Sequence, residues 1–328
     1  MLRKELRRAV LAALAALSIA CTGTSTGTSP DSTSPKTDGS STVDASKNHG
    51  DLKTPAPDAT IADAGKGDAV ATRCGDGKCQ SGETVSNCPA DCSAAPTIWS
   101  PRPGTSWQWQ LTGKLDTTLK VKMYDIDLFD NSASTIAAIK KNGAAVICYF
   151  SAGSYEAWRS DAKTIPSAAR GKKMSGWDEL WLDVRHSGVH AVMLKRLDLA
   201  KSKGCDGVEP DNVDGYTNDT GFPLKGADQL AYNRLLAKEA HKRGLSIGLK
   251  NDVDQAAQLV GDFDWALNEE CVKYKECSRL SPFIKAGKAV FHVEYTPTNK
   301  GTVCGTTKPL SFDSMIKKMN LDAWLDRC

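Results

Sequence analysis

Aromatic side chains are absent from the first 98 residues of this 328-residue chain, which contain no Phe, Tyr or Trp. A segment without aromatic residues cannot bury enough apolar surface to offset the entropy that folding costs. Every aromatic residue lies at or after Trp99, so the packed core must form there. The chain also lacks a strong charge of either sign, because its net charge is +3 and its basic residues are dispersed. It therefore gives no sign of a nucleic-acid-binding protein.

Three further absences narrow the class of protein. The apolar run Ala9–Ala20 is much shorter than the ~20 residues that a membrane-spanning helix needs. No glycine-rich loop follows the first expected strand, which argues against a nucleotide-binding sheet. His186 and His190 have the spacing of some zinc ligands, but no third ligand is near them in the sequence, so we expect no metal site.

The N-terminal residues 1–21 have the composition of an export signal. Four basic residues precede the apolar run, which ends in Leu17-Ser18-Ile19-Ala20-Cys21. A basic start, a short apolar core and small residues are typical of a secretory signal peptide. The ending resembles a bacterial lipoprotein signal, with Leu one place further from the cysteine than usual. We expect export, either to the cell surface or outer membrane as a lipoprotein anchored through Cys21, or into the medium after ordinary cleavage nearby.

Two short regions follow the signal. Residues 22–70 are rich in Ser, Thr, Gly, Pro, Asp and Lys, and this composition predicts a disordered tether. Residues 71–94 form a separate cysteine-rich module, similar to small modules of exported bacterial proteins. Its four cysteines predict two disulfides among Cys74, Cys79, Cys88 and Cys92. The sequence does not determine which cysteines pair.

The cysteine-rich module also contains acids that are suited to a hard cation. Asp76, Glu83 and Asp91 could hold Ca²⁺, because calcium binds carboxylate and carbonyl oxygens. We favour the simpler interpretation, a disulfide-bonded module with surface acids. Zinc is not expected, because oxidised cysteines cannot ligate it. No other cofactor is expected.

Residues 97–328 have the composition of one large α/β domain. Apolar residues keep helical spacing over Val189–Ala200 and Leu230–Ala240. Strand-like runs occur at Trp107–Leu111, Val121–Phe129, Ala144–Phe150, Gly207–Pro210, Ser246–Lys250, Asp264–Asn268 and Ala289–Tyr295, with a short eighth near Leu321–Trp324. This alternation predicts an α/β fold of the (β/α)8 TIM-barrel type, with a doubly wound open sheet as the alternative.

Catalytic groups of such a barrel lie at the carboxyl ends of its strands. Nearly every expected strand end carries an acid, an amide or an aromatic residue. Candidate substrate-binding residues are Asp125, Asp127, Tyr149, Glu209, Asn212, Asp214, Lys250, Asn251, Asp252, Glu270, Glu294 and Tyr295. The rim of the barrel is therefore acidic, although the whole chain is slightly basic.

Acids and aromatic residues together favour sugar chemistry. Glycoside hydrolysis needs one carboxylic acid to protonate the leaving oxygen and a second carboxylate as nucleophile or base. Aromatic faces pack against the apolar faces of sugar rings. An acidic cleft also favours a cationic polysaccharide. We expect a monomeric enzyme with a polysaccharide substrate, no nucleic acid partner, and membrane contact only through the lipid anchor.

The barrel region resembles glycoside hydrolase family 114, the endo-α-1,4-polygalactosaminidase-like family. The matching segments are WQWQL from Trp107, YDIDLFD from Tyr124, ICYFSAGSYE from Ile147, LWLDVR from Leu180, GVEPDNVDGYTNDTGFP from Gly207, GLKND from Gly248, NEEC from Asn268 and EYT from Glu294. The resemblance implies a TIM barrel that cleaves galactosamine-containing polysaccharide. It also implies that Asp211 and Glu269 are the catalytic acids, and by analogy we favour Asp211 as nucleophile or charge stabiliser and Glu269 as general acid.

Several alternatives stay open at this point. A non-catalytic sugar-binding protein could use the same barrel, although such proteins have usually lost one of the acids. Strand alternation places Glu209 on the same face as Asp211, and Glu270 opposite Glu269, supporting the site from outside. Asp125 and Asp127 either bind substrate or form a buried hydrogen-bonded layer. The expected barrel disulfides join Cys271 to Cys277 and Cys304 to Cys328, whereas Cys148 and Cys205 either pair or stay buried thiols.

Overall fold

The computed structural model describes residues 74–75, 79–80, 82–92 and 98–328, which belong to two separate compact units. The signal sequence with Cys21 and the tether lie outside the described residues. None of the described helices has both the length and the apolar character that crossing a membrane requires.

The small unit is held together by two interleaved disulfides. Cys74 pairs with Cys88 and Cys79 with Cys92. Cys88 directly precedes the short helix α2, Pro89–Cys92, and Cys92 ends it. Glu83 accepts a hydrogen bond from the backbone N–H of Gln80 at 2.8 Å, which ties the module's loop to itself. In the described part of this unit, both clusters with three potential metal ligands contain disulfide-bonded cysteines, which have no thiolate to offer.

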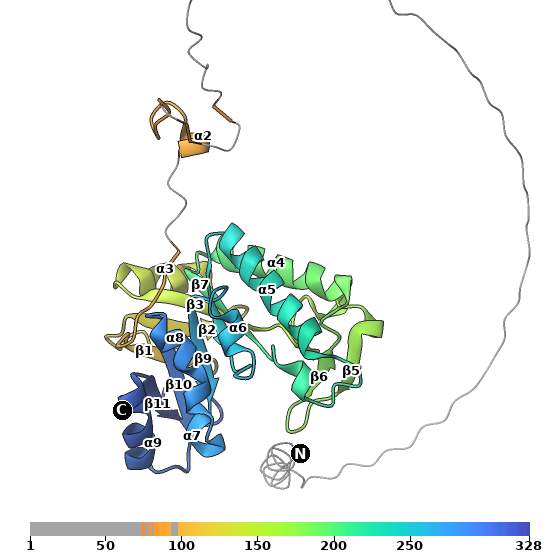
Figure 1. Ribbon diagram of the computed structural model, residues 1–328, viewed down its shortest axis with the longest axis vertical. Coiled ribbons are helices and arrows are strands. Elements are labelled where there is room, and N and C mark those ends of the chain that lie inside the picture. Colours follow the sequence, from red (N-terminus) through yellow and green to blue (C-terminus); the bar gives the residue numbers. More distant parts are fainter. Residues whose placement is uncertain (1–73, 76–78, 81, 93–97) are drawn as a thin grey trace, which may run out of the picture. The chain divides into compact units, whose positions relative to one another are not determined.

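The large unit is built on eight parallel strands in sequential order, as the sequence predicted. They are β1 Trp107–Gln110, β2 Met123–Asp127, β3 Ala145–Ser151, β7 Gly207–Asp211, β8 Ser246–Lys250, β9 Trp265–Glu269, β10 Val290–Tyr295 and β11 Asp313–Lys317. Every neighbouring pair in this order is parallel, and the sheet curls into a TIM-type barrel (Figure 1). The carboxyl ends of all eight strands therefore meet at one rim.

The eighth strand is not where the sequence placed it. It is β11, and the predicted segment Leu321–Trp324 is an irregular loop beside β1. In that loop, the Leu321 carbonyl accepts hydrogen bonds from the N–H groups of Leu111 and Thr112. The antiparallel strand β12, Asp326–Arg327, lies on β11, and the Arg327 guanidinium donates to the Trp107 carbonyl at 3.1 Å. These contacts join the last strand to the first.

Helices cover the outer face of the barrel (Figure 1). The two longest, α4 and α5, pack against each other and contain the helical spacing that the sequence shows over Val189–Ala200 and Leu230–Ala240. Gly204 caps α4 in the left-handed conformation. The full set is α3 Ala133–Lys141, α4 Ser187–Lys203, α5 Gly226–Lys242, α6 Ala256–Leu259, α7 Cys271–Tyr274, α8 Ser281–Lys285 and α9 Lys300–Thr307, with short 3₁₀ turns at Ala162–Thr164, Ser167–Ala169, Gly215–Thr217, Cys277–Leu280 and Lys308–Leu310.

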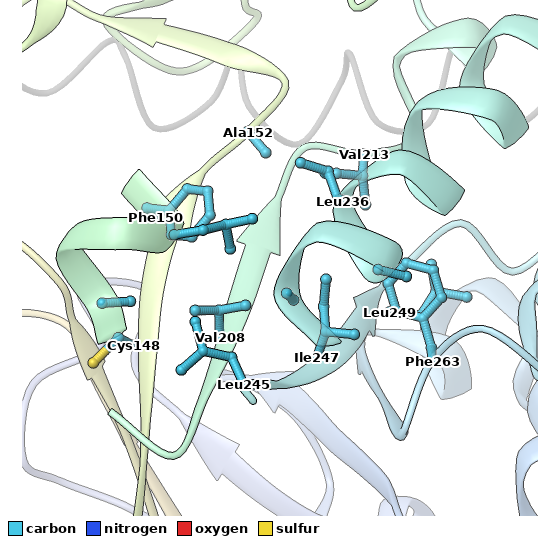
Figure 2. Packing of buried hydrophobic residues seen from close by; sticks show 14 of the residues in the cluster. Cys148, Phe150, Ala152, Val208, Val213, Leu236, Leu245, Ile247, Leu249 and Phe263 are labelled. Atoms are coloured by element: carbon cyan, nitrogen blue, oxygen red, sulfur yellow. The ribbon is translucent and has the colours of Figure 1, made fainter. Parts of the chain in front are cut away.

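Strand alternation divides the core into two layers. Side chains such as Ile147 point into the barrel and pack with Trp107, Trp265 and Phe291. Their neighbours, such as Cys148, point outward into the layer between sheet and helices. Figure 2 shows part of this outer layer, in which side chains of β3, β7 and β8 lie beside Leu236 of α5. The period of two that separates these layers also decides which polar residues face the barrel axis.

A small antiparallel sheet is inserted between β3 and α4. It contains β4 Ser154–Glu156, β5 Arg170–Lys173 and β6 Glu179–Leu182, in the order β4-β6-β5. We call residues 152–186 the rim insertion, because the segment follows the carboxyl end of β3. The Leu182 N–H of the central strand β6 donates to the Gly153 carbonyl at the start of the insertion. The Lys172 N–H of the outer strand β5 donates to the Thr220 carbonyl, which ties β5 to the loop after β7.

Three disulfides stabilise the barrel. Cys271–Cys277 and Cys304–Cys328 form as predicted. Cys148 and Cys205, which the sequence left open, also pair, with their Cα atoms 6.1 Å apart. The register explains this pairing, because Cys148 lies opposite Val208 and the segment entering β7 brings Cys205 within reach.

Candidate active site

A cleft of about 710 Å³ opens at the carboxyl ends of the barrel strands and runs under the rim insertion. Twelve aspartates and glutamates line it, against five lysines and arginines, together with eight tryptophans and tyrosines. Asp211 and Glu269 both face this cleft, as do Tyr149, Lys250 and Tyr295. The cleft is thus acidic and aromatic, as the strand ends predicted.

A buried lysine lies at the centre of the site. The Lys250 ammonium group contacts Glu209 Oε1 at 2.7 Å, Asp211 Oδ1 at 3.1 Å and Glu269 Oε2 at 3.4 Å. Its Nζ also lies 4.6 Å from the centre of the Trp109 ring. These carboxylates raise the Lys250 pKa even though burial opposes its charge, so the side chain stays cationic. One positive charge therefore holds three acids from β7 and β9 together.

Two acids form the floor of the site. Asp125 and Glu209 are fully buried on the inward faces of β2 and β7, where Trp109 donates to Glu209 Oε2 at 3.0 Å. Burial raises the pKa of both, that of Glu209 to about 7. Neither oxygen of the Asp125 carboxyl has a hydrogen-bond partner among the described residues, and after burial the neighbouring Glu209 charge raises its pKa further. The pair supports Lys250 from below and does not line the cleft.

Asp211 is held by donors on both of its oxygens. Tyr149 donates to Oδ2 at 3.1 Å, and the Asn212 backbone donates to Oδ1 at 2.8 Å. Asn212 reaches this position because its φ is 62°, in the left-handed region. Gly153 makes room for it, since a Cβ there would lie 1.7 Å from the Asn212 carbonyl oxygen.

Glu269 has a similar set of partners on the opposite side of Lys250. The Tyr295 hydroxyl donates to Oε1, and the Asn251 amide donates to Oε2 at 3.0 Å. Burial raises the pKa of this carboxyl, but the Lys250 charge and these donors outweigh it, so its pKa is lowered. Glu269 is therefore ionised in the free protein at neutral pH.

A hydrogen-bonded chain joins Asp211 to the rim insertion. The Asn212 amide bridges Asp211 Oδ2 and Ser151 Oγ, at 3.2 and 2.9 Å. Ser151 bonds Ser154 at 2.5 Å, and Ser154 donates to Glu179. Burial raises the Glu179 pKa to about 7. Sequence reasoning missed Glu179, which belongs to a short strand of the insertion and has no barrel-strand signal.

A second acidic group lies at the end of β8. Asp252 accepts a hydrogen bond from Asn233 at 2.8 Å and lies near Asp214 and Tyr216. Burial and the Asp214 charge raise the pKa of Asp252 to about 8. All four positions Asp214, Tyr216, Asn251 and Asp252 line the cleft.

Three other candidates have different positions. Asp127 lines the cleft but forms a bidentate pair with the buried Arg159, at 3.0 and 2.7 Å. Glu270, expected outside the site, lines it, because a left-handed φ of 61° turns the chain inward after β9. Glu294 lies outside the cleft on the outer face of β10, where it accepts bonds from His292 and the Val272 N–H.

Comparisons with known proteins match the barrel region to glycoside hydrolases. The sequence profile of glycoside-hydrolase family GH114 matches residues 89–328. A crystal structure of Ega3 from Aspergillus fumigatus in complex with galactosamine is 43% identical, with a TM-score of 0.68, and the match covers 70% of this chain and 97% of that one. The glycoside hydrolase domain of PelA from Pseudomonas aeruginosa has the same fold at 13% identity, with a TM-score of 0.55 over 68% and 98% of the two chains. A comparison with curated proteins gave no match.

Proposed function

The chain belongs to glycoside-hydrolase family GH114 and is a glycosidase, and from this we propose that it cleaves α-1,4-linked galactosamine-containing polysaccharide. The likeness to Ega3, whose crystal structure contains galactosamine, is the observation that carries the choice of sugar. The acidic lining of the cleft supports it, because ammonium groups of a galactosamine polymer favour a negative surface.

We assign Asp211 as the nucleophile and Glu269 as the general acid. In the first step an Asp211 oxygen bonds to the anomeric carbon while the glycosidic C–O bond breaks. Glu269 gives its proton to the departing oxygen. In the second step water attacks the anomeric carbon, the bond to Asp211 breaks, and Glu269 accepts the proton from that water.

The lowered pKa of Glu269 in the free enzyme is compatible with this role. Its side chain is 26% exposed, and the water in contact with it stabilises the charged form. A sugar in the cleft displaces that water, which strengthens the burial effect and raises the pKa of Glu269. Glu269 thus takes up a proton when substrate binds, and kcat/KM should be highest in mildly acidic solution.

The geometry favours retention of anomeric configuration. Asp211 Oδ1 and Glu269 Oε2 both contact Lys250 Nζ, at 3.1 and 3.4 Å. Because both oxygens contact the same nitrogen, the distance between them cannot exceed the sum of these two distances. That sum only reaches the lower limit of the ~6.5–9.5 Å that separates the two carboxyl groups of inverting enzymes. Retaining pairs are about 5–5.5 Å apart.

The assignment is tested with the mature protein and two isosteric variants, Asp211→Asn and Glu269→Gln. On galactosamine polymer, each variant should lose at least ~10²-fold in kcat while keeping its fold, as judged by circular dichroism. The first step on α-galactosaminyl fluoride needs no proton donor, so Glu269→Gln should release a burst of fluoride before its second step slows for lack of a base, whereas Asp211→Asn should release none. NMR of the first product should show the α-anomer.

Other outcomes would change the proposal. Wild-type turnover in either variant removes that residue from the mechanism, and β-anomeric product excludes retention. The opposite fluoride pattern exchanges the two roles. Hydrolysis of galactose polymers with none of galactosamine polymers would refute the proposed substrate.

We also propose that the enzyme is exported and anchored through a lipid on Cys21. The support is the basic start and short apolar run before this cysteine, together with the five disulfides of the described residues, which suit an oxidising compartment. Cys21→Ala should release the enzyme from the membrane fraction, because lipidation supplies the membrane affinity. A variant that still sediments with membranes after a high-salt wash would disprove the anchor.

A further inference from the structure

Two tryptophans of the rim insertion are unusually exposed. Among the described residues, the large apolar side chains with exposed surfaces are Val85, Trp158, Trp177 and Trp324. Trp158 is 57% exposed and Trp177 45%, yet both line the cleft that contains Asp211 and Glu269. Exposed aromatic surface costs free energy in water unless something covers it, and its placement at a cleft indicates a ligand.

The backbone beneath each tryptophan is fixed. Trp158 directly precedes Arg159, whose buried guanidinium bonds Asp127 and also contacts Glu156 at 2.8 Å. Trp177 lies in the turn between β5 and β6, where its N–H donates to the Met174 carbonyl. The preceding Gly176 has a φ of 86°, a conformation that glycine adopts readily. Both rings therefore stand on an ordered support, so little backbone entropy is lost when they bind a ligand.

The charges around the rings are balanced. On β5, Lys172 pairs with Asp219 at 2.9 Å and Lys173 with Asp178 at 2.9 Å. This rim therefore does not repel a polymer that carries ammonium groups, and the rings offer it two kinds of contact. A tryptophan face stacks on the C–H face of a sugar, and it attracts an ammonium group through its π-electrons.

We propose that Trp158 and Trp177 form a binding track for sugar units of the polymer that lie beyond the scissile bond. The inference rests on the proposed function and deepens it: the track makes the enzyme selective for long chains. Units near Asp211 and Glu269 are held by the barrel residues, whereas the tryptophans bind units farther along the chain.

The test uses the full mature enzyme and the variants Trp158→Ala, Trp177→Ala and the double variant. Trp324→Ala is the matched control, because Trp324 is 39% exposed but does not line the cleft. Substrates are galactosamine polymer and α-galactosaminyl fluoride. We expect each single variant to lose roughly tenfold in kcat/KM on polymer, chiefly through KM, and to keep wild-type activity on the fluoride. Trp324→Ala should match the wild type on both.

Binding provides a second measurement that does not depend on turnover. In an Asp211→Asn background, calorimetry with galactosamine oligomers of increasing length should show affinity that rises with length, and this gain should vanish in the double tryptophan variant. Equal losses on fluoride and polymer, or a length dependence that survives in the double variant, would overturn the track. Absence of hydrolysis by the wild type with length-dependent binding intact would instead refute the proposed function alone.

Discussion

Lys250 shows how one buried charge can organise several acids. Its ammonium group contacts carboxylates that come from two strands, and each of those carboxylates also accepts bonds from a tyrosine, tryptophan or asparagine. Without the cation, repulsion among these acids would favour protonation, and their positions would loosen. The sequence placed Lys250 at a strand end, but its central position depends on inward alternation along β8, which only the curled sheet converts into proximity to the acids of β7 and β9.

Buried acids make stability depend on pH. Burial raises the pKa of Glu179, Glu209 and Asp313 to about 7 and that of Asp252 to about 8. These groups are protonated in the folded protein at pH 5 but ionise near pH 4 when unfolded. Unfolding at neutral pH thus releases protons, so the free energy of unfolding falls as pH rises through their folded pKa values.

We therefore predict a higher Tm at pH 5 than at pH 8, with a shift of roughly 2–4 °C for each kcal/mol lost. Acids whose pKa is lowered, such as Glu269 and Asp183, finish titrating below this window and leave the slope unchanged. The check is a thermal melt series from pH 5 to 8. Asp313→Asn, outside the cleft, should reduce the slope without changing activity. A Tm that is constant or rises across this range would contradict the raised pKa values.

Three neighbouring strands end in the same way. Asp211, Lys250 and Glu269 are the last residues of β7, β8 and β9, and each is followed by a residue with a left-handed φ: Asn212, Asn251 or Glu270. A left-handed backbone conformation costs free energy in any residue other than glycine, and residues with this strain are concentrated at functional sites. The turn brings the following side chain back over the cleft, which is why Glu270 lines it against the expectation from alternation.

The strands with strong apolar patterns could be predicted from the sequence, whereas weakly patterned ones could not. The bounds of Ser246–Lys250 were predicted correctly, because its apolar residues occupy every second position and the run lies between Gly244 and a polar end. In contrast, β11 reads DSMIK, and its two apolar residues, Met315 and Ile316, are adjacent and do not alternate, so its signal was lost. The rim insertion was missed for a related reason: its strands are short and form their own sheet, outside the barrel's repeat.

Folding concentrates acidic side chains in the cleft of a chain whose overall charge is slightly positive. The chain is slightly basic, with 42 lysines and arginines against 39 acids, yet the cleft is strongly acidic. Only folding gathers these acids, because they come from strand ends far apart in sequence. A chain of nearly neutral overall charge can thus present a local field to a cationic polymer, while long-range repulsion between molecules stays small.

The Cys148–Cys205 bond encloses the rim insertion within a covalent loop. The bond joins residues 57 positions apart, and of the disulfides in the described residues it alone spans this segment. A protease that cuts once between residues 149 and 204 cannot release either fragment. A single tryptic cut inside this loop should thus give two fragments of the barrel on a reducing gel that migrate as one band without reductant, and the nicked enzyme should keep its two ends together. Separation of the fragments without reductant would show that this bond is not formed.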